Sequence, residues 1–237
     1  MTRMLTPVAP PKRHYIMRET PILESGAHMA AAEFLRRYAK LPGITAELVN
    51  GIVHMAAPLR ANHHGEPDAL LQTWLGTYAI ATPGVRHFLN TTTRLGPDDV
   101  PQPDGSLTLP ATAGGRSPIG QDGYLHGPPD LVVEVAASSA SIDVNEKFDS
   151  YRRAGVREYV GWRTEDECID WWQLEDDEYR PIPREADGSM RSRAFPGLWL
   201  DVEAMLDLDG PRVMAMLQHG LQSPGHRAFA SGLTRAA

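Results

Sequence analysis

The strongest limits on the fold come from residues 127–160, which have the sequence GPPDLVVEVAASSASIDVNEKFDSYRRAGVREYV. The apolar run LVVEV at residues 131–135 contains three branched valines, which favour a buried β-strand. The small polar run that follows suits a loop. A helix is then predicted from about Val144 to Ala154, and Gly155 supplies its C-terminal signal. A strand, a loop and a helix are therefore expected within one short segment.

Two charged residues in this segment mark it as the candidate functional site. Glu134 lies within the apolar strand, where a carboxylate is costly unless it is paired, hydrogen-bonded or bound to a metal. Lys147 lies near the start of the predicted helix, for which Asp143 is the expected N-cap. A second acid, Asp104, lies in an earlier Pro-Gln-Pro-Asp turn. Two carboxylates and a lysine can together hold a divalent metal and activate a water.

Each of these residues also has an ordinary structural interpretation. Glu134 is alternatively a buried acid paired with an arginine. Lys147 alone is typical of a solvated helix, and Asp104 alone is typical of a turn. The pair His63-His64 fits a solvated helix start better than a metal site, because no third ligand lies at metal-binding spacing.

Composition indicates one domain with additions at its ends. The chain has 237 residues, of which 42% are hydrophobic, enough for a sizeable core. We expect residues 1–26 to form a flexible arm, 27–208 the main domain, and 209–237 a C-terminal helix and a disordered tail. One cysteine excludes an internal disulfide, and no apolar run approaches the length of about 20 residues that a membrane helix needs. A cytoplasmic protein is expected.

The net charge of −7, from 23 basic and 30 acidic side chains, argues against strong non-specific binding to nucleic acid. A metal-dependent nuclease remains compatible with this charge, since its cleft needs acids and the bound cations offset them.

The remaining pattern predicts further helices and strands. Helices are expected at 28–40, 66–80 and 212–221, and a hairpin at 44–55 around the turn Asn50-Gly51. Residues 85–95, 106–109, 157–162 and 168–174 favour strands, residues 178–183 favour an edge strand, and residues 194–206 favour a strand-like turn followed by a helix start. Residues 110–128, rich in Gly, Ala, Ser and Pro, predict a long mobile surface loop.

Five phrases, spread over about residues 28–206, resemble the Uma-type family of putative restriction endonucleases, within the PD-(D/E)xK nuclease superfamily. They are AELVNGIVHMAAP at 46–58, PDGSL at 103–107, PPDLVVEVAASS at 128–139, DVNEKFDSYRRAGVREYV at 143–160 and FPGLWLDVEAM at 195–205. The resemblance implies an α/β (α+β) fold with a restriction-endonuclease-like core, a central mixed β-sheet flanked by helices. It also implies a magnesium-dependent phosphodiesterase site.

The resemblance transfers to individual residues. Asp104 matches the first acid of the family motif, and Glu134 matches the acid of its (D/E)xK strand. The motif lysine is replaced by Ala136, and Lys147 matches a variant in which the lysine has moved to the following helix. Glu47 matches an early acid that the superfamily often places beside the metal.

Two further positions bear on the comparison. His63 matches a histidine at the start of the second helix of many relatives. Gly105 departs from the pattern, because a strand residue usually follows the first acid.

The implied site would hold Mg²⁺, or Mn²⁺ in its place, between Asp104 and Glu134, with the backbone carbonyl of Val135 as a third ligand. Lys147 would act as a point charge near the attacking water or the phosphate, and Glu47 would bind a second metal or orient a water. The expected substrate is DNA, and a homodimer would suit cleavage of both strands. The alternatives are a binding or dimerisation module with little activity, and a hydrolase for another phosphodiester.

Overall fold

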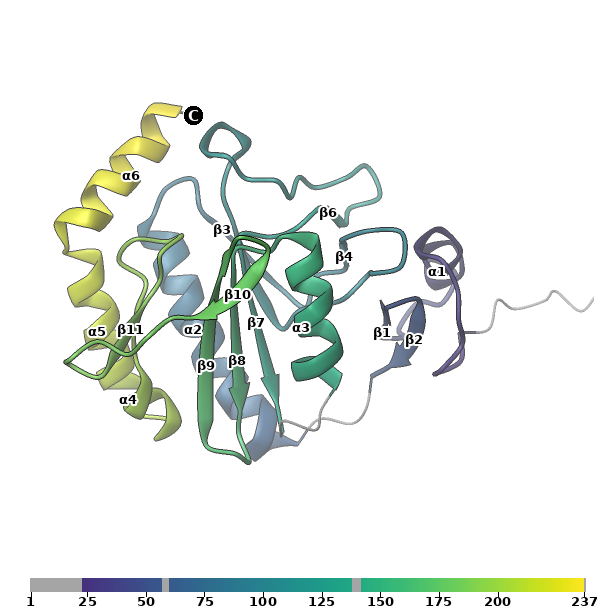
Figure 1. The fold of residues 1–237 in the computed structure, drawn as a ribbon, viewed down its shortest axis with the longest axis horizontal. Coiled ribbons are helices and arrows are strands. Elements are labelled where there is room, and N and C mark those ends of the chain that lie inside the picture. The colour runs from purple at the N-terminus through teal and green to yellow at the C-terminus, as the bar shows by residue number, and fades with distance from the viewer. Residues whose placement is uncertain (1–22, 57–59, 138–141, 237) are drawn as a thin grey trace, which may run out of the picture.

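A six-stranded mixed β-sheet forms the centre of the protein, with helices on both of its faces (Figure 1). The computed structural model describes residues 23–56, 60–137 and 142–236, with the backbone alone at 142–145 and 235–236. The strands lie in the order β10 (Glu178–Pro181), β9 (Cys168–Glu175), β8 (Glu158–Arg163), β7 (Leu131–Ala136), β5 (Gly105–Thr108) and β3 (Arg86–Leu89). Only β7 and β8 are parallel among these neighbours. The predicted mixed sheet flanked by helices is confirmed.

The two faces of the sheet carry different cores. Alternate residues of β7, Leu131, Val133 and Val135, pack with α2 (Glu66–Ala81) and the C-terminal helices in the main core. Val132 points to the other face and packs with Tyr151 of α3 (Ile142–Ala154). In Figure 1 α3 lies in front of the sheet and α2 behind it. Since side chains alternate along a strand, Glu134 lies on the α3 face.

Helix α3 begins two residues earlier than predicted and ends as predicted. Its C-terminal signal, Gly155, has φ 84°, a conformation that glycine adopts at little cost. The cap role expected for Asp143 rests on a side chain outside the described residues.

A second, smaller unit is formed by α1 (Ala31–Tyr38) and the hairpin of β1 (Ala46–Val49) and β2 (Ile52–Met55). The predicted turn is confirmed: Asn50 and Gly51 have φ values of 53° and 74°, as a tight hairpin turn requires. This unit has its own apolar core, which includes Phe34 and Leu48.

The expected flexible arm at 1–26 falls mainly outside the described residues. The part that is described belongs to this small unit, because Leu23 is buried and the Gly26 N–H donates to the Val53 carbonyl at 2.8 Å.

The segment expected as a long loop contains short regular elements. Strand β6 (Leu125–His126) pairs in parallel with β4 (Thr93–Arg94), and η2 (Ala111–Ala113) forms a single 3₁₀ turn. The segment is also tied to the start of β8, since Arg157 donates to the Gly114 carbonyl at 2.7 Å. The loop therefore follows the body of the domain closely.

The C-terminal part differs from the sequence prediction. After β11 (Ser189–Arg191) pairs with β12 (Trp199–Asp201), the chain forms α4 (Val202–Leu206), α5 (Gly210–Leu221) and α6 (Pro224–Ala236). The expectation of a disordered tail was wrong, because Leu233 is buried and His226 bonds the Thr82 hydroxyl at 2.9 Å.

Over the described residues, no helix combines the length and the apolar character that crossing a bilayer requires.

Candidate active site

Glu134 and Lys147 meet at the carboxyl end of β7, on the face covered by α3. The Lys147 ammonium lies 3.2 Å from Glu134 Oε1 and 3.4 Å from Oε2. Both side chains are almost fully buried, with 2% of Glu134 and 3% of Lys147 exposed. The partner of the buried Glu134 is therefore Lys147 of the following helix. The ordinary structural interpretation of Glu134 predicted an arginine in this place.

Glu47 reaches the same lysine from the small unit. Its Oε1 lies 2.8 Å from the Lys147 ammonium and also accepts the backbone N–H of Gln102. A buried cation between two carboxylates is held strongly, because removing either partner leaves an uncompensated charge that costs about 3–5 kcal/mol. The hairpin that carries Glu47 is thereby fixed against α3.

Asp104 lies just before β5, on the strand next to Glu134. The register pairs Gly105 with Val133, so the preceding residue is opposite Glu134. Asp104 Oδ2 accepts the Val135 N–H at 2.7 Å. The N–H and the carbonyl of a strand residue point to the same edge, so the Val135 carbonyl is directed to the side on which Asp104 lies. The three ligand groups predicted from sequence are therefore brought to one end of β7.

A histidine is also present, but not the one that the sequence comparison indicated. His64 Nε2 lies 3.4 Å from Asp104 Oδ1, whereas His63 contributes its backbone carbonyl to the Thr164 hydroxyl at 2.8 Å. Both histidines lie in the π-helical turn η1 (Ala61–Gly65). A π turn has no clear sequence signature, so the contact between His64 and Asp104 was not predictable.

Tyr151 is a further contact that sequence reasoning missed. Its hydroxyl donates to Glu134 Oε1 at 2.6 Å, and the whole side chain is buried. Burial, followed by the nearby charge of Glu134, raises the pKa of Tyr151 well above its ordinary value, so the phenol stays a donor. The available signal was the spacing of four from Lys147, which puts both residues on one helix face.

A polar network lies beside Asp104 on the α2 side. Gln72 donates to Asp68 Oδ1 at 2.6 Å and bonds His87 through its carbonyl oxygen at 2.8 Å. Burial, and then the charge of Asp104, raise the pKa of Asp68. Gly105 lies directly under Gln72: a β-carbon there would be 2.4 Å from Gln72 Oε1 and 2.9 Å from Val133 Cγ2. This contact explains why glycine follows the first acid.

A Gly105→Ala substitution is therefore expected to lower stability by about 1–3 kcal/mol, as overpacking does. Gln72 cannot move away without losing both of its bonds. Thermal unfolding should show a decrease of several degrees in Tm. Gly232→Ala is the control, because Gly232 lies in α6 with no atom within 4 Å of the added carbon. Equal Tm values for the two variants would contradict this account of Gly105.

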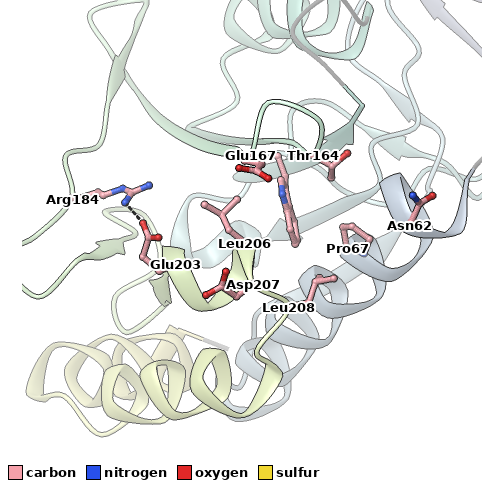
Figure 2. Close-up of a pocket in the computed structure, with 10 residues that line it drawn as sticks. Asn62, Pro67, Thr164, Glu167, Arg184, Glu203, Leu206, Asp207 and Leu208 are labelled. Carbon is pink, nitrogen blue, oxygen red and sulfur yellow. Dashed lines mark hydrogen bonds and ion pairs between the residues drawn. The ribbon is translucent and has the colours of Figure 1, made fainter.

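A separate pocket is lined in part by acids (Figure 2). Its volume is about 400 Å³, and Glu167, Glu203 and Asp207 line it, with Arg184 bonded to Glu203. None of the predicted site residues lines this pocket. Its acidic lining also does not suit a phosphate group.

Within the described residues, no three His, Cys, Asp or Glu side chains are placed to hold a metal ion together. The donor set at the end of β7 is smaller, two carboxylates and a backbone carbonyl. It consists of oxygen alone, as hard cations such as Mg²⁺ prefer, and Mg²⁺ commonly takes one or two carboxylates and keeps several waters.

Comparisons with known proteins agree with this fold. A crystal structure of a putative nuclease belonging to DUF820 from Anabaena variabilis superposes with a TM-score of 0.56 at 15% sequence identity, covering 73% of this chain and 97% of that one. At this identity the similarity establishes the fold alone. No curated protein sequence matches the chain. The sequence model of Uma2, described as a putative restriction endonuclease, matches residues 31–203, a range that includes Glu47, Asp104, Glu134 and Lys147. The chain belongs to the Uma2 family.

Proposed function

We propose that this protein is a Mg²⁺-dependent endonuclease that hydrolyses DNA phosphodiester bonds. One observation carries the proposal. Lys147 of α3 lies against Glu134 at the end of β7, and at the same end Asp104 accepts a hydrogen bond from the Val135 N–H. The two acids could hold a metal that assists phosphodiester hydrolysis, and the lysine could stabilise the negative charge that develops. Family membership supports the same reaction class.

Asp104, Glu134 and the Val135 carbonyl would hold the metal, with Mn²⁺ able to replace Mg²⁺. The bound cation would offset charge on the phosphate and lower the pKa of a bound water. It would also balance the acids at this end of the sheet, which otherwise outnumber the cations and would repel DNA.

Lys147 would stabilise negative charge that develops on the phosphate or on the attacking water. Its ammonium is held from both sides by Glu134 and Glu47, at 3.2 and 2.8 Å. Glu47 would act in catalysis by fixing this lysine, because the oxygen that contacts Lys147 also accepts the Gln102 N–H. A homodimer would offer one such site to each DNA strand.

A second candidate function is a binding module that retains the nuclease fold without cleavage. The observation in its favour is the burial of Lys147, of which 3% is exposed. A lysine enclosed by two acids in this way also fits a purely structural ion pair.

Cleavage of supercoiled plasmid and of single-stranded circular DNA distinguishes the two functions. Wild-type protein should cut with Mg²⁺ or Mn²⁺ and stop when EDTA is added. Lys147→Met keeps most of the side-chain volume without its charge, and should lose about 100- to 1000-fold in rate. Lys40→Met, at an exposed position after α1, is the matched control and should cut normally. Absence of metal-dependent cleavage by the wild type would favour the binding module.

A further inference from the structure

Tyr151 contacts the proposed metal-binding carboxylate from inside the protein. It follows Lys147 by one helical turn on α3, and its hydroxyl donates to Glu134 Oε1 at 2.6 Å. The bond is shorter than the 3.2 Å contact between the lysine and the same oxygen. Glu134 is therefore held by two donors from one helix face, a charged one and a neutral one.

The phenol ring has little freedom to move. It is fully buried, and its centroid lies 5.7 Å from that of the Tyr159 ring. The Tyr159 ring in turn stacks on Trp172, with the centroids 5.6 Å apart. Phe148, also in α3, packs edge-on against Tyr159, with the ring centroids 5.6 Å apart. Because these rings set the position of the Tyr151 hydroxyl, they also set the orientation of the carboxylate that it bonds.

Because the Tyr151 hydroxyl is uncharged, it affects the binding of a cation by Glu134 differently from a charged donor. A lysine that orients a carboxylate also cancels its charge and so weakens its attraction for a metal. A phenol orients the carboxylate and leaves its full negative charge in place. We propose that Tyr151 is a positioning residue that holds Glu134 in the orientation needed to bind a divalent cation. The inference rests on the proposed function in assigning Glu134 to the metal.

Tyr151 is enclosed in the core and cannot touch DNA, so it would act through Glu134. Its loss should weaken metal affinity and leave the KM for DNA unchanged at saturating metal. Hydrogen-bond partners of metal ligands typically contribute about 10- to 100-fold to metal affinity. Loss of a residue that served only to stabilise the fold would not weaken metal affinity while leaving the KM for DNA unchanged.

Mn²⁺ binding by Tyr151→Phe, measured by calorimetry and by electron paramagnetic resonance, tests the inference without relying on cleavage. The Kd should increase about 10- to 100-fold relative to wild type, and excess Mn²⁺ should restore most of the cleavage rate. Tyr179→Phe is the matched control: Tyr179 belongs to the same aromatic cluster, but its hydroxyl bonds the Val156 carbonyl at 3.1 Å. Circular dichroism melts of both variants establish that each is folded at the temperature of the assay.

The outcomes separate this inference from the proposed function. A Kd in Tyr151→Phe equal to that of wild type, or equal losses in both tyrosine variants, would overturn the role of Tyr151. Wild-type protein that binds Mn²⁺ but cuts no DNA would overturn the nuclease, while the ratio of the Kd values would still decide the role of Tyr151. Wild-type protein that binds no Mn²⁺ would overturn both.

Discussion

A Glu134→Gln protein is expected to remain folded and to lose at least about a thousandfold in Mg²⁺-dependent DNA cleavage. Glutamine has nearly the same volume as glutamate, and its carbonyl oxygen can still accept the Tyr151 hydroxyl. A neutral amide, however, is a poor ligand for Mg²⁺ and provides no charge to balance Lys147. Loss of the several kcal/mol that a metal contributes to the transition state, about 4 kcal/mol, corresponds to this decrease in rate.

The decrease should appear in single-turnover cleavage of plasmid DNA at saturating protein. Glu175→Gln, at an exposed position at the end of β9, is the matched control and should cleave as wild type. Glu134→Ala should be at least as inactive and less stable, because it leaves the Tyr151 hydroxyl without its acceptor. Cleavage by Glu134→Gln within tenfold of wild type would remove this carboxylate from the catalytic site.

Glu158→Gln is expected to destabilise the protein strongly, although it is a conservative change. The Glu158 carboxylate is completely buried at the start of β8 and accepts four donors. They are the Trp171 indole at 3.0 Å, the Ser192 hydroxyl at 2.7 Å and the backbone N–H groups of Arg193 and Ala194 at 2.6 and 2.7 Å. Burial raises the pKa of Glu158, against the opposing effect of these bonds.

A glutamine amide would point its NH₂ group at two of these donors and leave them unpaired. Since each unsatisfied buried group costs about 1–3 kcal/mol, a loss of about 3 kcal/mol or more is expected. Denaturant unfolding should measure this as a decrease in the free energy of unfolding with an unchanged m-value. Glu178→Gln, at an exposed position, is the control and should change stability by less than about 0.5 kcal/mol. A loss below 1 kcal/mol in Glu158→Gln would contradict the assigned bonding.

The elements that were predictable from sequence are those whose signals are local. Signals within a few residues predict three of these features: the turn Asn50-Gly51, the strand at 131–135 and the helix end at Gly155. Helix α2 was predictable in the same way, from its buried stripe and from Pro67 in its first turn. The fold class followed from the order of these elements and from the family phrases.

What was not predictable depends on contacts between distant segments. Glu158 appears in the sequence as an ordinary acid at the start of a strand, and only the approach of residues 192–194 shows why it is buried. Tyr151 has the pattern of a core residue, and its contact with Glu134 depends on how α3 lies on the sheet. Helix α6 contacts Thr82, which is far away in the chain, so this contact was not apparent in the sequence of the helix itself.

The position of the lysine on α3 also determines when the site can form during synthesis. Glu47, Asp104 and Glu134 all precede Lys147, and Glu47 is 100 residues before it. A nascent chain that ends before α3 therefore contains the three acids and no ammonium group to join them. Bringing residues so far apart together carries the entropic cost of closing a long loop, which slows folding. The site is completed only when the small unit containing Glu47 docks against α3. The same docking step therefore joins two separately packed cores and brings Glu47 to Lys147.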